Sequence, residues 1–235
     1  MTARFISFEG IDGSGKSTQA RMLADAMRGR GEGVVLTREP GGSTGAEEIR
    51  ALVLTGDPGR WSPETEICLF TAARRDHLER RIIPALQQGR TVITDRFADS
   101  TRAYQGGEGT GHAGLVDTLH RAMIGLEPDR TFIVDLPPEE GLKRSYLRAA
   151  RAEEASRLDP QGDPRSQEEE VLLSQLRSRA GREAAEMRFE SLGLPFQQRL
   201  RANFFAIAKA FPDRIRVIDG SGTPEAVHAR VLAAL

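Results

Sequence analysis

Five short apolar runs recur along the chain, and each is rich in the β-branched and aromatic residues that favour strands. Hydrophobic residues follow one another almost without interruption in these runs, a pattern typical of strands buried on both faces of a parallel sheet. The predicted strands are residues 4–9, 33–39, 91–96, 131–136 and 214–219.

The segments between the predicted strands are long enough for the crossover helices that parallel strands need. Two of the predicted helices have a proline near the start and one ends at a glycine, which are common boundary signals. The predicted helices are residues 17–28, 64–88, 195–210 and 224–235. The alternation of strands and helices predicts an α/β fold, a doubly wound five-stranded parallel sheet flanked by helices.

Residues 148–188 depart from this alternation, because they are highly charged and contain no strand pattern. A turn-like sequence, QGDPRSQ at residues 161–167, separates two segments of helical character. Two interpretations are open at this point: a solvated helical excursion, or a mobile lid that carries functional arginines. We predict a single domain over residues 1–235, with an insertion at about 148–188.

Composition and charge narrow the class of protein. The chain has 235 residues and a formal net charge of −1, which argues against general nucleic-acid binding, since that usually needs a strongly basic face. Its one cysteine, Cys68, lies in the apolar sequence ICLF, where we expect an inert buried thiol and no intramolecular disulfide. The first ten residues show no signal-peptide pattern and no apolar run is long enough to span a membrane, so we predict a soluble, cytoplasmic protein.

The first chemical signal is FEGIDGSGKSTQ at residues 8–19, where four residues separate Gly10 from Gly15, Lys16 and Ser17. In such a loop, backbone amides wrap nucleotide phosphates, the lysine reaches the terminal phosphates and the hydroxyl is placed for Mg²⁺. A predicted strand before it and a helix after it disfavour the alternative, a glycine turn that only caps a helix. The sequence therefore predicts a nucleoside triphosphate site, with ATP as the expected ligand. Its predicted residues are Gly10, Ile11, Asp12, Gly13, Ser14, Gly15, Lys16, Ser17 and Thr18.

Two further charged clusters follow the second and third predicted strands. Arg38 lies in TREPGGST at residues 37–44, and Asp95 and Arg96 lie in TDRFADSTRAYQGG at residues 94–107. Ligands gather at the carboxyl ends of parallel strands, so these side chains and the phosphate loop should share one cleft. Guanidinium groups bind phosphate bidentately, which indicates a second anionic ligand. The alternative is that both arginines only form structural pairs with Glu39 and Asp99.

A third cluster, ICLFTAARRDH at residues 67–77, places Phe70 and Arg74 four residues apart on one helical face. An aromatic ring beside a guanidinium can stack on a flat base and hydrogen-bond its edge, although a phenylalanine on such a helix is more often part of a core. Ser100 and Tyr104 have the same spacing.

These motifs together resemble bacterial thymidylate kinase, of the P-loop nucleoside monophosphate kinase family, over nearly the full chain. The resemblance rests on EGIDGSGKST, TREPGG, LFTAAR, DRFADSTRAYQGG and the late PFQQRLRANF…RIRVID. It implies transfer of the γ-phosphoryl group of ATP to dTMP, giving dTDP and ADP for dTTP synthesis, in a homodimer with Mg²⁺. It also implies that the charged insertion is a helical lid.

The resemblance assigns roles to individual residues. Arg38 and Arg96 would hold the dTMP phosphate, Phe70 would stack on thymine, and Arg74 would hydrogen-bond its edge. Asp12 would contact the sugar 3′-hydroxyl, Tyr104 would crowd the 2′ position, and Asp95 would join Ser17 at Mg²⁺. The complete expected dTMP site is Asp12, Arg38, Pro40, Phe70, Arg74, Arg96, Ser100, Tyr104 and Gln105.

The resemblance also favours the lid interpretation. Ser14, before Gly15, is neutral, and family members without a basic residue there have arginines in the lid. Arg148, Arg151, Arg157, Arg182 and Arg188 fall in or near the insertion. The chain departs from the family pattern where Met187 replaces an acid beside Arg188. The expected catalytic residues are Lys16, Arg96, Asp95, Arg188, Arg151 and Arg148.

Other functions stay open at this point. A deoxynucleoside kinase would need a carboxylate base near a neutral hydroxyl, whereas Arg38 and Arg96 indicate a charged acceptor. A non-catalytic nucleotide-binding switch, or an ATPase that acts with DNA, would not need the acceptor cluster. A thymidylate kinase that also accepts dUMP is a further possibility. For the homodimer, a candidate surface is the long helix around Ile67 and Leu78, although the sequence does not distinguish an interface stripe from a core stripe there.

Overall fold

The sheet has the five parallel strands that the sequence predicts, each within one residue of its predicted bounds. The computed structural model describes residues 3–57, 59–157, 189 and 192–235. The strands are β1 (Phe5–Glu9), β2 (Val34–Arg38), β3 (Thr91–Asp95), β4 (Arg130–Asp135) and β5 (Ile215–Asp219). Their order is β2-β3-β1-β4-β5, so β1, which leads into the phosphate loop, lies in the centre.

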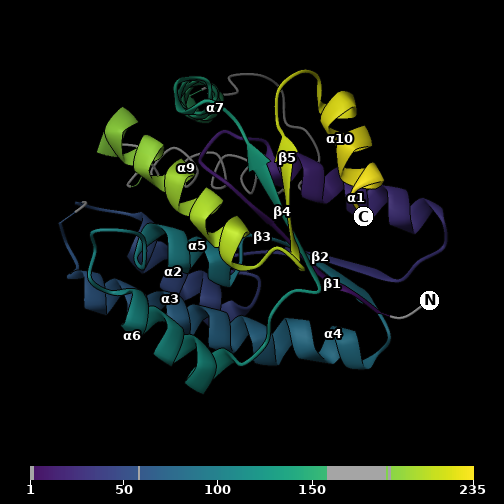
Figure 1. Ribbon diagram of the computed structural model, residues 1–235, viewed down its shortest axis with the longest axis horizontal. Coiled ribbons are helices and arrows are strands. Elements are labelled where there is room, and N and C mark those ends of the chain that lie inside the picture. Colours follow the sequence, from purple (N-terminus) through teal and green to yellow (C-terminus); the bar gives the residue numbers. More distant parts are fainter. Residues whose placement is uncertain (1–2, 58, 158–188, 190–191) are drawn as a thin grey trace, which may run out of the picture.

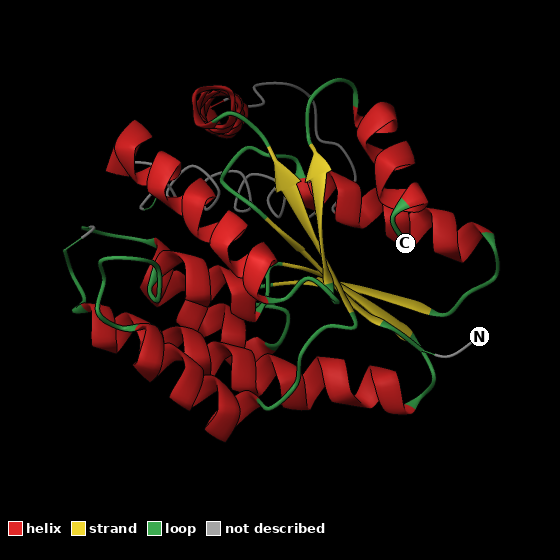
Figure 2. Cartoon of the chain, in the orientation of Figure 1, coloured by secondary structure: helices red, strands yellow, loops and turns green. Residues whose placement is uncertain are grey.

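Helices cover both faces of this sheet, as Figures 1 and 2 show. One face is covered by α1 (Lys16–Gly29) and α10 (Pro224–Ala233). The other elements are α2 (Thr44–Leu54), α3 (Pro63–His77), η1 (Leu78–Ile82), α4 (Ile83–Gln87), α5 (Ala98–Tyr104), α6 (Ala113–Leu119), η2 (His120–Ile124), α7 (Pro138–Arg157) and α9 (Gly193–Ala210). Among these, η1, α4, α5 and α9 contribute to the core on the opposite face.

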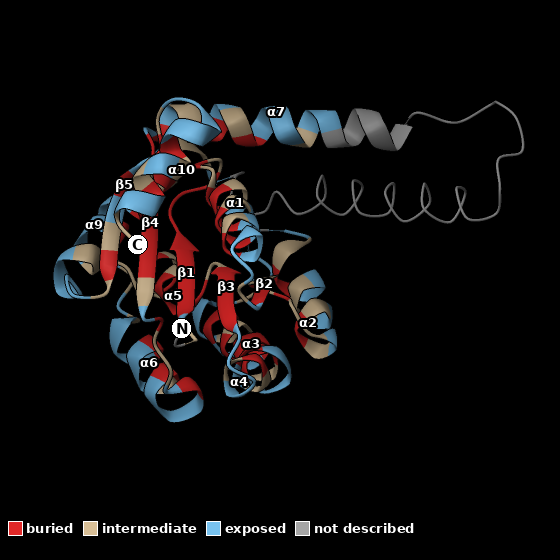
Figure 3. Cartoon of the chain, turned by 90° about the vertical axis from the view of Figure 1, so that its right-hand side faces the viewer, coloured by how far each residue is buried: buried red, intermediate tan, exposed pale blue. Residues whose placement is uncertain are grey.

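The two-sided covering explains the continuous hydrophobicity of the strands. On β1, Ile6 and Phe8 pack against α1 and α10, whereas Phe5, on the alternate face, packs against η1 and α4. All three side chains are at most 2% exposed. Figure 3 shows the strands as the buried centre of the molecule and the outer helix faces as exposed. Such burial leaves the carboxyl ends of the strands as the place for polar chemistry.

The predicted helix at 64–88 is present as α3, a π-helical turn η1 and α4, and the prediction of a buried Cys68 on it is wrong. Ile67 and Leu78 are at most 1% exposed within one chain, so these two side chains belong to the core, while the dimer surface predicted on the helix around them stays a prediction. Cys68 is exposed, since a helix turns about 100° per residue and carries it away from the buried Ile67.

The hydrophobic pattern did not predict α2, α5 and α6. The helices α5 and α6 have seven residues each, too few to repeat a helical period clearly. Only Ala46 and Val53 are buried on α2, so its apolar stripe is weak.

The charged segment is helical where the structure describes it. Helix α7 begins at Pro138 and continues past residue 148 to Arg157, and Figure 3 shows its first part running across the end of the domain at which β1 and β4 end. The predicted turn and Arg182 lie outside the described residues. No helix in the described part of the chain is long and apolar enough to cross a membrane.

Candidate functional site

A cleft of about 1370 Å³ opens at the carboxyl ends of β1, β2 and β3. It gathers most of the residues that the sequence singled out. The predicted residues that line it are Asp12, Gly13, Gly15, Lys16, Ser17, Thr18, Arg38, Pro40, Phe70, Arg74, Asp95, Arg96, Ser100, Tyr104, Gln105 and Arg148. Gly10, Ile11 and Ser14 belong to the same loop but do not line the cleft.

The phosphate loop joins β1 to the first turn of α1, as its motif requires. Gly13 and Gly15 have φ angles of 73° and 101°, in the region that favours glycine. A Cβ on Gly13 would lie 2.0 Å from the carbonyl oxygen of Gly141, at the start of α7, so this position also needs a glycine for space. The loop is therefore packed directly against the base of the predicted lid.

Lys16 is buried at the base of the loop, and its Nζ donates to the carbonyl oxygen of Ile11 at 2.6 Å. Burial, together with the nearby Arg96, lowers the pKa of Lys16 to about 8, against the opposing effect of Asp12. The ammonium group is thus largely charged at neutral pH and available to a phosphate.

Ser17 and Asp95 form a pair of oxygen ligands at the end of β3. The Ser17 hydroxyl donates to Asp95 Oδ2, and Asp95 Oδ1 is buried with no hydrogen-bond partner among the described residues. An orphaned carboxylate oxygen beside a hydroxyl fits a hard cation such as Mg²⁺, which prefers oxygen ligands.

Asp12 is the centre of a hydrogen-bonded group that joins the phosphate loop to α5 and α9. Arg96 Nη2 donates to Asp12 Oδ1 at 2.5 Å, while Tyr104 and Gln197 donate to Asp12 Oδ2 at 3.0 and 3.1 Å. Burial alone would raise the pKa of Asp12, but Arg96 and Lys16 outweigh it and hold that pKa below its usual value. Asp12 is therefore an ionised carboxylate that can accept a hydrogen bond from a hydroxyl group.

The alternative partners proposed for the two arginines are wrong. Asp99 pairs with Arg102 and Arg214, not with Arg96. Arg38 pairs with Glu47 at 3.0 Å, not with Glu39, and both partners of that pair are more than 40% exposed. An exposed pair of this kind is weak, so Arg38 is free to turn toward an anionic ligand.

Phe70 and Arg74 lie on α3 as predicted, and Arg74 also belongs to a buried ion pair with Glu39. Its Nε donates to Glu39 Oε2 at 2.7 Å, and its Nη2 donates to the Phe97 carbonyl and to Thr101 at 3.0 Å. Both Arg74 and Glu39 are nearly buried. Arg74 is thus held rigidly, while its Nη1 has no hydrogen bond within the described residues.

Beside this pair, His77 Nδ1 lies 2.9 Å from Glu39 Oε1, and His77 Nε2 lies 2.7 Å from Thr37 Oγ1. The ring also occupies the space that a Cβ on Gly42 would need, with Nε2 at 2.5 Å. His77 therefore supports both the arginine and the glycine turn after β2.

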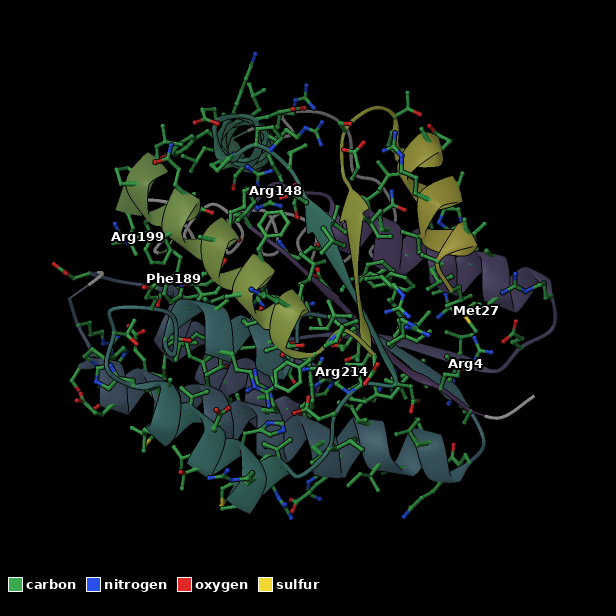
Figure 4. All side chains as sticks on the ribbon, viewed as in Figure 1. Arg4, Met27, Arg148, Phe189, Arg199 and Arg214 are labelled. Carbon is green, nitrogen blue, oxygen red and sulfur yellow. The ribbon has the colours of Figure 1, made fainter. Side chains whose placement is uncertain are left out.

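The lid arginines divide into three groups. Arg148 lines the cleft and projects from α7 toward the sheet, as Figure 4 shows. Arg151 is exposed and does not line the cleft. Arg188 lies outside the described residues, whereas Phe189 lines the cleft and its ring centroid is 6.3 Å from that of Phe70.

Sequence reasoning missed several residues that shape the site: Glu9, Glu39, His77, Arg144 and Gln197. Arg144 lines the cleft beside Arg148, and a spacing of four residues on α7 was an available signal for it. Glu9 and Gln197 are each 0% exposed, and nothing in their local sequence indicates which distant residues they contact.

Comparisons with known proteins all point to one family. A family model described as thymidylate kinase matches residues 8–162. The thymidylate kinase of Dinoroseobacter shibae is 54% identical over 232 residues, covering 99% of this chain and 96% of the relative. That of Ruegeria pomeroyi is 53% identical over 230 residues, covering 98% and 93%. A crystal structure of thymidylate kinase from Ehrlichia chaffeensis superposes with a TM-score of 0.67 at 32% identity, covering 100% of this chain and 99% of that one.

Proposed function

The chain belongs to the thymidylate kinase family, and from this we propose that its cleft transfers the γ-phosphoryl group of ATP to dTMP, giving dTDP and ADP for dTTP synthesis. The observation that carries the proposal is the contact between the phosphate loop and the residue after β3, where Arg96 Nη2 lies 2.5 Å from Asp12 Oδ1. A guanidinium for a second phosphate thus lies next to the loop that binds the first. Two anionic ligands placed end to end are what phosphoryl transfer needs.

For the donor half, we propose that the loop residues from Gly10 to Thr18 bind ATP. Backbone amides around Gly13 and Gly15 would face the phosphates. Lys16 would exchange its bond to the Ile11 carbonyl for one to the terminal phosphates, because a charged acceptor binds an ammonium more strongly than a neutral carbonyl does.

We propose that Ser17 and Asp95 hold Mg²⁺. The unpaired Asp95 Oδ1 beside the Ser17 hydroxyl supports this assignment. A magnesium site in such enzymes needs only one or two protein ligands, since phosphate and water oxygens supply the others. When bound there, Mg²⁺ would neutralise charge on the β- and γ-phosphates.

For the acceptor half, we propose that Arg38 and Arg96 hold the phosphate of dTMP. Arg96 is already fixed by Asp12, and the exposed Arg38 would leave Glu47 to complete the pair. Asp12 would accept a hydrogen bond from the sugar 3′-hydroxyl. Tyr104, whose hydroxyl also contacts Asp12, would limit the space at the 2′ position.

The base would lie at the α3 side of the cleft. Phe70 offers a ring face, and the free Nη1 of the rigid Arg74 offers a donor to an edge of thymine. Gln105, whose amide donates to the buried Glu66 at 3.3 Å, would line this pocket together with Pro40 and Ser100.

The transfer itself needs no general base, because the attacking oxygen belongs to a phosphate that is ionised at neutral pH. Catalysis therefore consists of positioning two phosphates and neutralising the charge that spreads over the transferring group. We propose that Lys16 and Arg96 provide this charge from the body of the domain. Arg148 would add to it from α7, with Arg151 and Arg188 as further lid candidates.

The domain that carries the site, and its oligomeric state, are proposed from the same family. We propose a single domain over residues 1–235 with a lid insertion at about 148–188, of which the structure describes residues 148–157. Family membership further supports a cytoplasmic homodimer. Sedimentation at micromolar concentration checks the dimer, since particles of only 25.8 kDa would contradict it.

A coupled assay of ADP release, with ATP and Mg²⁺ and with dTMP, thymidine, dUMP or no acceptor, tests the function. We expect rapid turnover with dTMP, slower or comparable turnover with dUMP, and only background rates with thymidine or without acceptor. Turnover that does not depend on an acceptor would indicate an ATPase. Turnover on thymidine alone would indicate a deoxynucleoside kinase. Either result would contradict the acceptor site proposed here.

A further inference from the structure

Glu9 is a buried carboxylate to which the reaction described above assigns no role. It ends β1 directly before the phosphate loop and is 0% exposed. Its Oε1 accepts from the backbone amides of Phe97 and Ser100 at 2.7 and 3.2 Å, and its Oε2 accepts from the Ser100 hydroxyl at 2.6 Å. All three donors lie at the start of α5, so Glu9 joins the central strand to the segment that carries the acceptor arginine.

Ser100 connects Glu9 to the side chain of Arg96. Its Oγ accepts from Arg96 Nη1 at 3.1 Å while its single hydrogen is donated to Glu9. A hydroxyl has one hydrogen, so the acceptor at Glu9 decides which side of Ser100 presents a lone pair. Without that acceptor, the Ser100 hydroxyl loses the bond that fixes its orientation, so the lone pair that accepts from Arg96 is no longer held in one place.

The backbone of Arg96 shows independently that this segment is constrained. Its φ angle is 72°, the one positive value among the non-glycine residues that the structure describes. Such a conformation persists only where neighbouring bonds hold it. The Arg96 amide donates to the Phe8 carbonyl at 2.9 Å, and the next amide, that of Phe97, is held by Glu9. Glu9 thus fixes both the side chain and the backbone of this arginine.

We propose that Glu9 is a positioning residue, which orients Ser100 and through it the Arg96 guanidinium for the phosphate of the acceptor nucleotide. This inference rests on the acceptor site proposed above. Glu9 does not line the cleft, so its effect on the ligand is carried entirely by these two residues.

The charges around Glu9 make its effect depend on pH. Burial first, and then Asp99 on α5, raise the pKa of Glu9 to about 7, against the opposing effects of Ser100, Arg96 and Phe97. Lys16, from the first turn of α1, is the further charged group that senses Glu9. The carboxylate is therefore present mainly above pH 7, and on acidification Glu9 gains a proton and loses an acceptor site.

Calorimetric titration of dTMP and of thymidine into wild-type protein and Glu9→Gln tests the proposal. At pH 8 we expect Glu9→Gln to bind dTMP about tenfold more weakly, because the hydrogen bond from Ser100 to a charged carboxylate is lost. Its affinity for thymidine should be unchanged. From pH 8 to pH 6, the ratio of wild-type to mutant affinity for dTMP should fall toward one. Protonation of the dTMP phosphate itself affects both proteins alike and does not enter this ratio.

Glu127→Gln is the matched control. Glu127 Oε1 accepts from Nη2 of Arg102, which lies on α5 as Ser100 does, at 2.5 Å. Among the described contacts, Glu127 forms no bond to Ser100 or Arg96. This variant should keep the wild-type ratio of dTMP to thymidine affinity at both pH values. Ser100→Ala removes the hydroxyl that connects Glu9 to Arg96. It should show the same loss of dTMP affinity without the dependence on pH, and it provides a test even if Glu9→Gln does not fold.

Two results would overturn the proposal. One is an equal loss of dTMP and thymidine affinity in Glu9→Gln, which would make Glu9 a structural residue of the fold. The other is unchanged dTMP affinity in both Glu9→Gln and Ser100→Ala. A wild-type protein that binds thymidine as tightly as dTMP would instead contradict the phosphate site itself, so the two failures are distinguishable.

Discussion

In the proposed donor half of the cleft, most residues are neighbours in one loop, residues 10–18, although Ser17 of this loop reaches Asp95 across 78 positions. The proposed acceptor half, which shares Asp12 with that loop, is assembled from side chains far apart in the sequence. Lys16 bonds to a residue five positions away. In the acceptor half, Arg96 and Gln197 reach Asp12 across 84 and 185 positions, and Glu9 reaches Ser100 across 91.

This difference has a physical consequence for each half. Backbone amides and glycines form the donor half, so its geometry follows from local conformation. The acceptor half contains the buried charges of Asp12, Glu39 and Arg74, and each has a partner from another element that offsets its desolvation. We therefore expect substitutions in the donor half to affect chemistry, and substitutions in the acceptor half to affect binding and stability together.

The largest effect is expected for Lys16→Ala. Removal of the charge that is proposed to bind the terminal phosphates should lower kcat by about 10³-fold, a loss comparable to that of an oxyanion donor. The affinity for dTMP should change little. Steady-state kinetics with a separate dTMP titration checks this, with Lys143→Ala on the exposed part of α7 as the control. An equal loss of dTMP affinity would show that the two halves are not separable.

The next effect is expected for Glu39→Gln, which leaves Arg74 without its buried counter-charge. The free energy of unfolding should fall by about 3 kcal/mol, as for other broken buried pairs. Glu47→Gln, in the exposed pair with Arg38, should cost less than about 1 kcal/mol. Urea denaturation measures both values. Similar losses in the two variants would mean that burial does not set the strength of these pairs.

A smaller effect is expected from the titration of Glu9. Its pKa is about 7 in the folded chain and 4.5 in an unfolded one, so the folded state holds the proton more tightly. Stability should therefore fall as pH rises from 5 to 7, by about 2 kcal/mol for this group. Thermal unfolding of wild-type protein and Glu9→Gln across this range checks the sign. A wild-type curve that rises more steeply with pH than the mutant curve would contradict it.

The smallest effect is expected for Gln197→Met, which removes one of three donors to Asp12 while keeping the volume of the buried side chain. Because Arg96 and Tyr104 remain, the KM for dTMP should rise only about fivefold, and the KM for ATP should stay constant. Gln198→Met, at the neighbouring exposed position, is the control. A larger change for ATP than for dTMP would place Gln197 with the donor half.

The strands, the place of residues 10–15 between β1 and α1, and the family were predictable from the sequence, and the structure and comparisons confirm them. Buried parallel strands give continuous apolar runs, and strand ends bring Arg38 and Arg96 to one edge without any knowledge of contacts. Cys68 shows where this reasoning fails, because an apolar neighbourhood in sequence does not fix the side of a helix.

The supporting residues of the acceptor half could not be predicted. Glu9, inside an apolar strand, and Gln197, on a helix, carry no local signal of a partner 91 or 185 positions away. His77 ends the motif at residues 67–77, yet only the fold shows that it lies between Glu39 and Thr37. Residue roles in the site, unlike the family, stay predictions for the experiments above.

The separation of the two halves is tested most directly by titrating ATP and dTMP independently into wild-type protein, Lys16→Ala and Arg96→Lys. The structure predicts opposite losses: Lys16→Ala should lose about tenfold or more in ATP affinity and keep dTMP binding. Arg96→Lys, which keeps the charge but not the bidentate fork, should lose about tenfold in dTMP affinity and keep ATP binding. Parallel losses of both ligands in both variants would contradict a cleft built from two separable halves.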